Sequence, residues 1–148
     1  MVDLILETVD KKDDVEALNE AILNGFDAVP LPPDVEPYRS IPLAMALRTP
    51  AGETKGGLIG QSAWGWLYVK YLWVAEAFRG HGYGKKLLDA AEAAARERGC
   101  HGIWLNTQSF QATAFYERQG YEQFGALPNM PESHRRVFYR KALMSDDS

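Results

Sequence analysis

The segment that most constrains this chain is residues 78–86, which read FRGHGYGKK. It follows an apolar run at residues 71–74 and precedes a helical pattern over residues 87–98. Alternating glycines let a backbone approach a ligand closely, and the start of a helix offers unpaired N–H donors at its positive end. Arg79, Lys85 and Lys86 add positive charge. The segment therefore predicts a site for a phosphate or pyrophosphate.

Two common phosphate-binding motifs do not fit this segment. A P-loop requires a glycine five residues before Gly-Lys-Ser/Thr, but Arg79 and Lys86 occupy the first and last of these positions. A Rossmann fingerprint, G-x-G-x-x-G, fails because its last position falls on Lys85 or Leu87. What remains is R-G-x-G-x-G-K between a predicted strand and a predicted helix.

The bulk composition indicates one globular domain in a reducing compartment. The 148 residues are 46% hydrophobic and 24% charged, with a net charge of −4, which does not favour nucleic acid as a partner. The single cysteine, Cys100, excludes an internal disulfide framework. The sequence shows no membrane-length apolar run, and Asp3 and Glu7 stand where a signal peptide would be basic and then apolar. We expect a cytoplasmic protein whose tail, residues 145–148, is frayed.

The first half of the chain predicts a strand, a helix and a three-stranded meander. Residues 2–9 are rich in branched side chains and predict a strand, and apolar spacing predicts a helix over residues 13–24. Four prolines break regular structure in residues 30–37, which form either a functional lid or substrate wall or a plain surface loop. Strands are predicted at residues 41–49, 58–63 and 67–74, with Trp64-Gly65-Trp66 as a hairpin or bulge.

The second half predicts a strand–helix–strand unit followed by a helix and two strands. The unit comprises residues 71–74, 87–98 and 101–107, which implies a parallel strand pair. Ser109 is the expected N-cap of a second helix that ends at Gly120. A short strand at residues 121–124, a loop over 125–133 and a last strand at 134–143 complete the chain. The order predicts a mixed, mainly antiparallel sheet with helices on both faces.

Three segments resemble the GNAT superfamily of N-acetyltransferases. They are the strand and glycine turn of residues 72–85, the helix that follows with Leu87-Leu88, Ala91-Glu92 and Gly99, and the segment ATAFYERQGY at residues 112–121. The resemblance implies an α/β (α+β) fold of six to seven strands with a splayed central strand, forming a single domain over residues 1–144. It also implies acetyl-CoA as co-substrate and direct attack by an amine in a ternary complex.

The resemblance further implies where the cofactor would bind. The residues expected to contact it are Leu72, Trp73, Val74, Arg79, Gly80, His81, Gly82, Tyr83, Gly84, Lys85 and Ser109. Fixed backbone donors near residues 72–74 would stabilise the oxyanion of the thioester. Ser109 is a departure from the family, which often has an asparagine at this position; a hydroxyl can hydrogen-bond the cofactor or cap the helix. Within this loop, we expect the side chain of His81 to point to solvent.

Two catalytic roles are expected from side chains. Tyr116 stands at the family's usual position for the acid that protonates the leaving thiolate, although a core tyrosine on a helix face is the alternative. Glu76 is the candidate base that deprotonates the amine, being close in sequence to the acyl site. No spacing argument separates it from Glu36, Glu132 or His134.

The predicted function is acetyl transfer from acetyl-CoA to a small-molecule or peptide amine. The alternative is a non-catalytic acyl-CoA-binding or sensing module. No metal is expected, because the three histidines lack ligand spacing. The aromatic residues Trp64, Trp66, Tyr68 and Trp73 are assigned to the core, an acceptor pocket or the surface of a homodimer.

Overall fold

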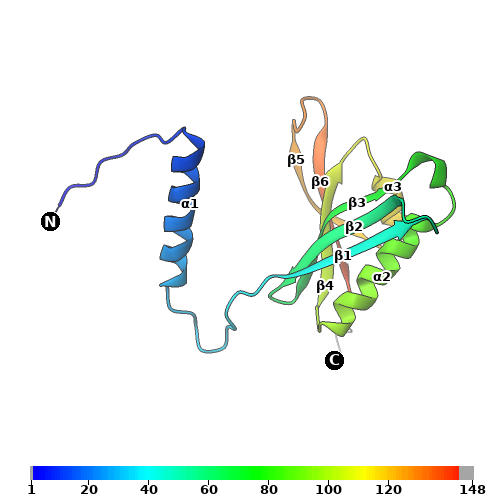
Figure 1. The fold of residues 1–148 in the computed structure, drawn as a ribbon, viewed down its shortest axis with the longest axis horizontal. Helices are drawn as coiled ribbons and strands as arrows, with labels where there is room; N and C mark the ends of the chain where they lie inside the picture. The colour runs from blue at the N-terminus through cyan, green and yellow to red at the C-terminus, as the bar shows by residue number, and fades with distance from the viewer. Residues whose placement is uncertain (1, 144–148) are drawn as a thin grey trace. The chain divides into compact units, whose positions relative to one another are not determined.

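The computed structural model describes residues 2–143, so the predicted frayed tail lies outside the described residues. The chain divides into two compact units, Met1–Pro37 and Tyr38–Ser148 (Figure 1). Within the described residues, no helix is long and apolar enough to cross a membrane.

The N-terminal unit contains one helix, α1 (Lys12–Asp27), which confirms the helix predicted from apolar spacing. The predicted strand over residues 2–9 is wrong, because these residues have no regular secondary structure. Branched residues favour a pleated conformation only when a neighbouring strand supplies hydrogen bonds, so strand propensity alone did not decide this segment.

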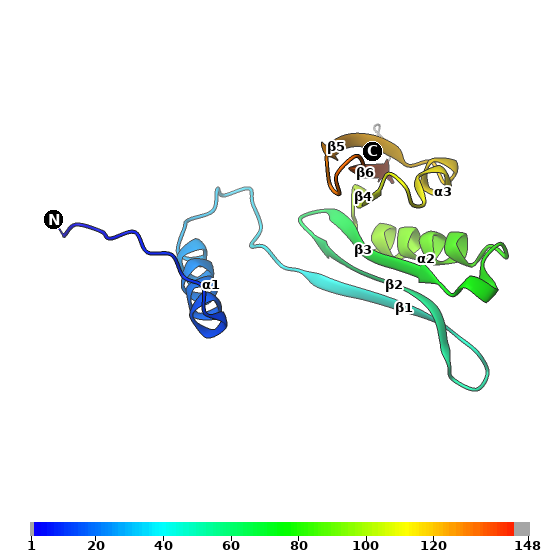
Figure 2. The same ribbon diagram turned by 90° about the horizontal axis from the view of Figure 1, so that it is seen from above.

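The second unit is a six-stranded sheet flanked by helices, as predicted. The strands lie in the order β1-β2-β3-β4-β6-β5, and of the strand pairs in the described part of the chain only β3–β4 is parallel. Helix α2 connects these two strands (Figure 2). The elements are β1 (Ile41–Arg48), β2 (Thr54–Ala63), β3 (Trp66–Val74), the 3-10 turn η1 (Glu76–Phe78), α2 (Tyr83–Glu97), β4 (Gly102–Gln108), α3 (Thr113–Arg118), β5 (Glu122–Pro128) and β6 (Arg135–Ala142).

The sequence predicted the β2–β3 connection as a hairpin or a bulge, and it predicted the connection before β6 as a loop. Trp64 and Gly65 both have positive φ, 46° and 83°, and form the tight β2–β3 hairpin that was one of the two predicted alternatives. The predicted loop at residues 125–133 is partly wrong, because β5 continues to Pro128, which pairs with Arg135. Proline is tolerated there because β5 is an edge strand.

The core lies between α2 and the middle of the sheet. Leu87, Leu88, Ala91 and Ala95 of α2 are buried and belong to the same cluster as buried residues of β2, β3, β4 and β6. The sheet contribution is Leu58, Leu67, Val69, Ile103, Leu105, Val137 and Tyr139. This packing fixes the start of α2 at the end of β3, where the glycine segment lies.

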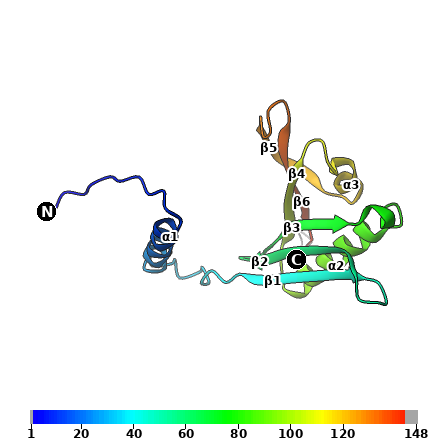
Figure 3. The ribbon, with the colours of Figure 1, turned by 45° about the horizontal axis from the view of Figure 1, so that its top comes forward.

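Strands β3 and β4 pair at one end only and then separate (Figure 3). Their parallel register runs from Trp66–Gly102 to Val69–Leu105, so residues 70–74 and 106–108 do not pair with each other. Opposite this point, β2 pairs Gly60 with Val69 and Ile59 with Tyr71, which leaves Lys70 as the extra residue of a bulge. The expected splayed strand is therefore present.

Gly60 makes this bulge possible. A Cβ atom at residue 60 would collide with the backbone oxygen of Tyr68, so no other residue fits without a shift of the strand.

Candidate functional site

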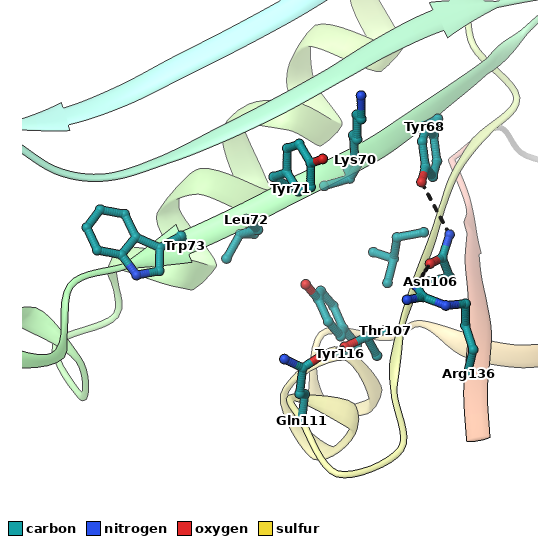
Figure 4. A pocket seen from close by; sticks show the side chains of 12 residues that line it. Tyr68, Lys70, Tyr71, Leu72, Trp73, Asn106, Thr107, Gln111, Tyr116 and Arg136 are labelled. Carbon is teal, nitrogen blue, oxygen red and sulfur yellow. Dashed lines mark hydrogen bonds between the residues drawn. The ribbon is translucent and has the colours of Figure 1, made fainter. Parts of the chain in front are cut away.

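The splay between β3 and β4 opens a cavity of about 620 Å³, called here the splay cavity (Figure 4). Its lining comes from β3 and β4 around the point where they separate, from α3 and the residue Gln111 before it, and from β6. The lining residues are Tyr68, Val69, Lys70, Tyr71, Leu72, Trp73, Leu105, Asn106, Thr107, Gln111, Tyr116 and Arg136.

A second cavity, of about 780 Å³, lies over the glycine segment and is called here the loop cavity. Leu72, Trp73, Thr107, Gln111 and Tyr116 line both cavities, so the two spaces are adjacent. The other residues of the loop cavity are Val74, Phe78, Arg79, Gly80, Gly82, Tyr83, Gly84, Lys85, Ala112, Phe115, Arg118 and Gln119.

The glycine segment has the conformation that an anion cradle requires. Gly80 and Gly82 have φ of 80° and 82°, a region that L-residues avoid, and a Cβ at either position would meet only open space. Gly82 is the N-cap of α2 and bears no side-chain cap, so the N–H groups of the first turn are free of side-chain acceptors at this end. The helix dipole adds to the attraction for an anion.

Two cations of the segment have defined partners. Arg79 Nε donates a hydrogen bond of 2.8 Å to the backbone oxygen of Val74, which ties the loop to the end of β3. Lys85 Nζ lies 2.7 Å from Asp89 Oδ2, one helical turn further on, and the hydrogen bond to this carboxylate raises the pKa of Lys85. Lys85 therefore remains a cation at the mouth of the loop cavity.

Gly84 serves a different purpose from the other two glycines. A Cβ at this position would lie 3.2 Å from Cζ of Phe115 on α3. Any larger residue would push α3 away from the start of α2. Gly84 thus sets the distance between the two helices that border the loop cavity.

Tyr116 lies where the two cavities meet. Its side chain is buried, and Figure 4 shows the hydroxyl directed from α3 toward β3. Burial raises the pKa of the Tyr116 hydroxyl above its ordinary value of 10.0. The phenol is therefore protonated at neutral pH and is able to donate a proton into the space between the strands.

An ion pair between a buried carboxylate and a half-buried lysine holds the end of α3 in place. Lys141 Nζ of β6 lies 2.8 Å from Glu92 Oε1 of α2, and it also donates a hydrogen bond of 2.9 Å to the backbone oxygen of Gln119. The Tyr121 hydroxyl donates to Glu92 Oε2 at 3.4 Å. Burial and the nearby carboxylate raise the pKa of Tyr121 strongly. The Glu92 carboxylate thus holds Tyr121, which precedes β5, and it holds Lys141, which binds the end of α3.

Most of the predicted cofactor contacts are brought together in the loop cavity. Its lining includes Leu72, Trp73, Val74, Arg79, Gly80, Gly82, Tyr83, Gly84 and Lys85. His81, Ser109 and Glu76 are not among the described residues that line either cavity. His81 and Glu76 are exposed. Their assigned roles stay predictions.

The predicted N-cap role of Ser109 is wrong. Helix α3 starts later, with Ala112 as its N-cap and no side-chain cap. The Ser109 hydroxyl instead accepts a hydrogen bond of 3.0 Å from the backbone N–H of Arg135, which joins the end of β4 to the start of β6. The sequence could not show this partner because it lies 26 residues away.

Several polar residues of the splay cavity were not identified from the sequence, among them Lys70 at the bulge of β3. Asn106 and Thr107 follow the buried half of β4, Gln111 precedes α3, and Arg136 comes from β6. The available signal was the position of Asn106 and Thr107 at the carboxyl end of a strand in a parallel pair, where sites commonly lie. Arg136 had no such signal.

This chain belongs to the acetyltransferase (GNAT) family, whose family model matches residues 34–121. It is 47% identical over 81 residues to blasticidin-S acetyltransferase from Streptomyces morookaense, a match covering 54% of this chain and 60% of that protein. The chain spans about three fifths of the length of the curated relatives that it matches.

Solved structures show the same fold. An acetyltransferase from Bacillus cereus ATCC 14579 superposes with a TM-score of 0.77 at 30% identity, covering 95% of this chain and 98% of that one. A protein described as a streptothricin acetyltransferase from Bacillus anthracis str. Ames, in complex with acetyl coenzyme A, superposes with a TM-score of 0.56 at 25% identity. That match covers 62% of this chain and 57% of the other.

Proposed function

We propose that this protein is an N-acetyltransferase that transfers the acetyl group of acetyl-CoA directly to an amine. The observation that carries the proposal is the contact between the loop cavity and the splay cavity at Tyr116. One space offers an anion cradle, the adjacent space is open for a second molecule, and a buried proton donor stands between them.

The glycine segment would bind the pyrophosphate of the cofactor. The N–H groups at the start of α2 would donate to the anion, and Arg79 and Lys85 would supply charge of the matching sign. Residues 72–74 of β3 pair with β2 on one side, but on the side toward β4 they have no ladder partner in the described residues. Its backbone donors and acceptors would pair with the amide groups of the pantetheine arm, as a neighbouring strand would.

The reaction needs one new bond and two proton transfers. The neutral amine attacks the thioester carbonyl, the C–S bond breaks, and the oxyanion that forms in between is stabilised by backbone N–H groups of β3. Tyr116 would protonate the leaving thiolate. The amine proton goes to a base, for which Glu76 stays our candidate, acting through water because its side chain lies outside both cavities.

The acceptor would be a small-molecule amine. Two relatives carry the names of antibiotic acetyltransferases, for blasticidin S and streptothricin. The splay cavity, at about 620 Å³, has the volume of a site for a drug-sized molecule.

The test is the release of CoA thiol from acetyl-CoA, measured with a thiol reagent over blasticidin S, streptothricin, simple amines and peptides. We expect turnover with at least one small-molecule amine, together with an acetylated product of the matching mass. Tight acetyl-CoA binding without turnover on any acceptor would instead support a non-catalytic binding module.

A further inference from the structure

The splay cavity contains a guanidinium group whose charge nothing in the described chain neutralises. Arg136 lies on β6, half-buried, and within the described residues it forms no ion pair. Its Nε atom is buried and has no hydrogen-bond partner in the described residues. An unpaired charge is costly to bury even in part, and an anionic ligand in the cavity would offset this cost.

The guanidinium is held in place by neutral groups. Nη1 donates to Asn106 Oδ1, and Asn106 Nδ2 donates in turn to the Tyr68 hydroxyl at 3.3 Å, a chain that Figure 4 shows crossing from β6 to β3. The amide of Gln108, oriented to satisfy both of its neighbours, accepts from Nη2 at 2.7 Å and donates to the backbone oxygen of Met130 at 2.6 Å. These contacts fix the group and leave its charge intact.

The remaining lining does not offset this charge. None of the described residues that line the splay cavity is Asp or Glu. Figure 4 shows that Lys70 extends away from Arg136, so Arg136 dominates the charge inside the cavity. A polycationic acceptor would be repelled from this space, whereas an acceptor with an anionic group would be attracted.

We propose that Arg136 is a specificity-determining residue that binds a carboxylate of the acceptor. The acceptor class is then a molecule with both an amine and a carboxylate, the amine reaching the junction at Tyr116 while the carboxylate pairs with the guanidinium. Arg suits this task because its planar fork matches carboxylate geometry. This proposal rests on the proposed function in one respect, which is that the amine of the acceptor lies at the junction at Tyr116. The carboxylate site itself does not depend on turnover.

The test compares matched ligands by calorimetric titration, with and without saturating CoA. The probes are ω-amino carboxylates with two to six methylene groups and their ω-amino carboxamides, which differ only in the charged group. At one or more lengths, we expect the carboxylate to bind about tenfold or more tightly than its carboxamide. The preferred length reports the distance from Arg136 to the amine site.

Three variants separate recognition from structure. Arg136→Gln should remove the preference and leave carboxamide and CoA affinities unchanged, and Arg136→Lys should retain part of it. Arg140→Gln is the matched control, because Arg140 lies on the same strand but is exposed and paired with Glu122. Equal affinities at every length in the wild type, or a preference that persists in Arg136→Gln, would overturn the proposal. If the proposed acetyltransferase function is wrong, the protein will not bind CoA or will not turn over acetyl-CoA. Neither of these results depends on the carboxylate preference.

Discussion

Lys141 on β6 and Glu92 on α2 form an ion pair of 2.8 Å in which the Glu92 side chain is only 6% exposed. Removing one partner of such a pair leaves a buried charge without compensation. Lys141→Met should therefore lower the free energy of unfolding by about 3 kcal/mol, measured by urea denaturation. It should also loosen α3, because Lys141 holds the backbone oxygen of Gln119.

The control for this prediction is the exposed pair of Arg140 and Glu122, which joins neighbouring strands of the same sheet. Arg140→Met should change the unfolding free energy little, because solvent screens the pair. Equal destabilisation by the two variants would show that burial does not determine the strength of the Lys141 contact.

Tyr116→Phe should slow the chemical step and leave cofactor binding almost unchanged. The hydroxyl faces the junction of the two cavities, while the ring supplies the packing, which phenylalanine keeps. Loss of a general acid lowers the rate by about 100-fold or more. Single-turnover kinetics and CoA titration measure the two effects. A single-turnover rate equal to that of the wild type would remove Tyr116 from the mechanism.

Gly82→Leu should weaken CoA binding by about tenfold or more. The substitution forces a side chain into the positive-φ region and places it over the anion cradle. Gly99→Leu is the matched control, since Gly99 has φ of 74°, open space around its Cβ position, and a place outside the lining of both cavities. Both variants should lose stability, measured by urea denaturation, but only Gly82→Leu should lose CoA affinity, measured by calorimetry. Equal CoA affinity in the two variants would contradict the cradle.

Stability should fall as the pH rises above about 10. Tyr121 has a folded-state pKa above its ordinary value, through burial and the adjacent Glu92 carboxylate. Below pH 10 the Tyr121 hydroxyl keeps its proton in both the folded and the unfolded state, so its full contribution to stability is present. Above pH 10 the hydroxyl ionises in the unfolded state while it stays protonated in the folded state, and the free energy of unfolding falls. Urea denaturation between pH 8 and 11.5 should show a steeper decline in the wild type than in Tyr121→Phe. Parallel curves would show that another group controls alkaline unfolding.

The sequence was sufficient to predict those elements whose conformation depends on residues close to each other in the chain. The glycine segment, the helix that follows it and the β2–β3 hairpin depend on residues adjacent in the chain. The helix is present but begins at Tyr83 rather than Leu87, and the hairpin is one of the two alternatives predicted for residues 64–66. Residues 2–9 and β5 were misread because a strand depends on its neighbour, and Ser109 because its hydrogen-bond partner is on another strand.

By itself, the sequence determined a glycine turn at the start of a helix, which we predict to be an anion cradle, and it predicted a proton donor at Tyr116. Only the tertiary structure brought Asn106 and Arg136 to the space that β3 and β4 leave between them. The physical reason is that the cradle uses backbone conformation encoded within a few residues. The splay depends on a bulge at Lys70, on Gly60 across from it, and on strands distant in sequence. The predicted cofactor site thus depends on local sequence, whereas the proposed choice of acceptor depends on the packing of strands that are distant in sequence.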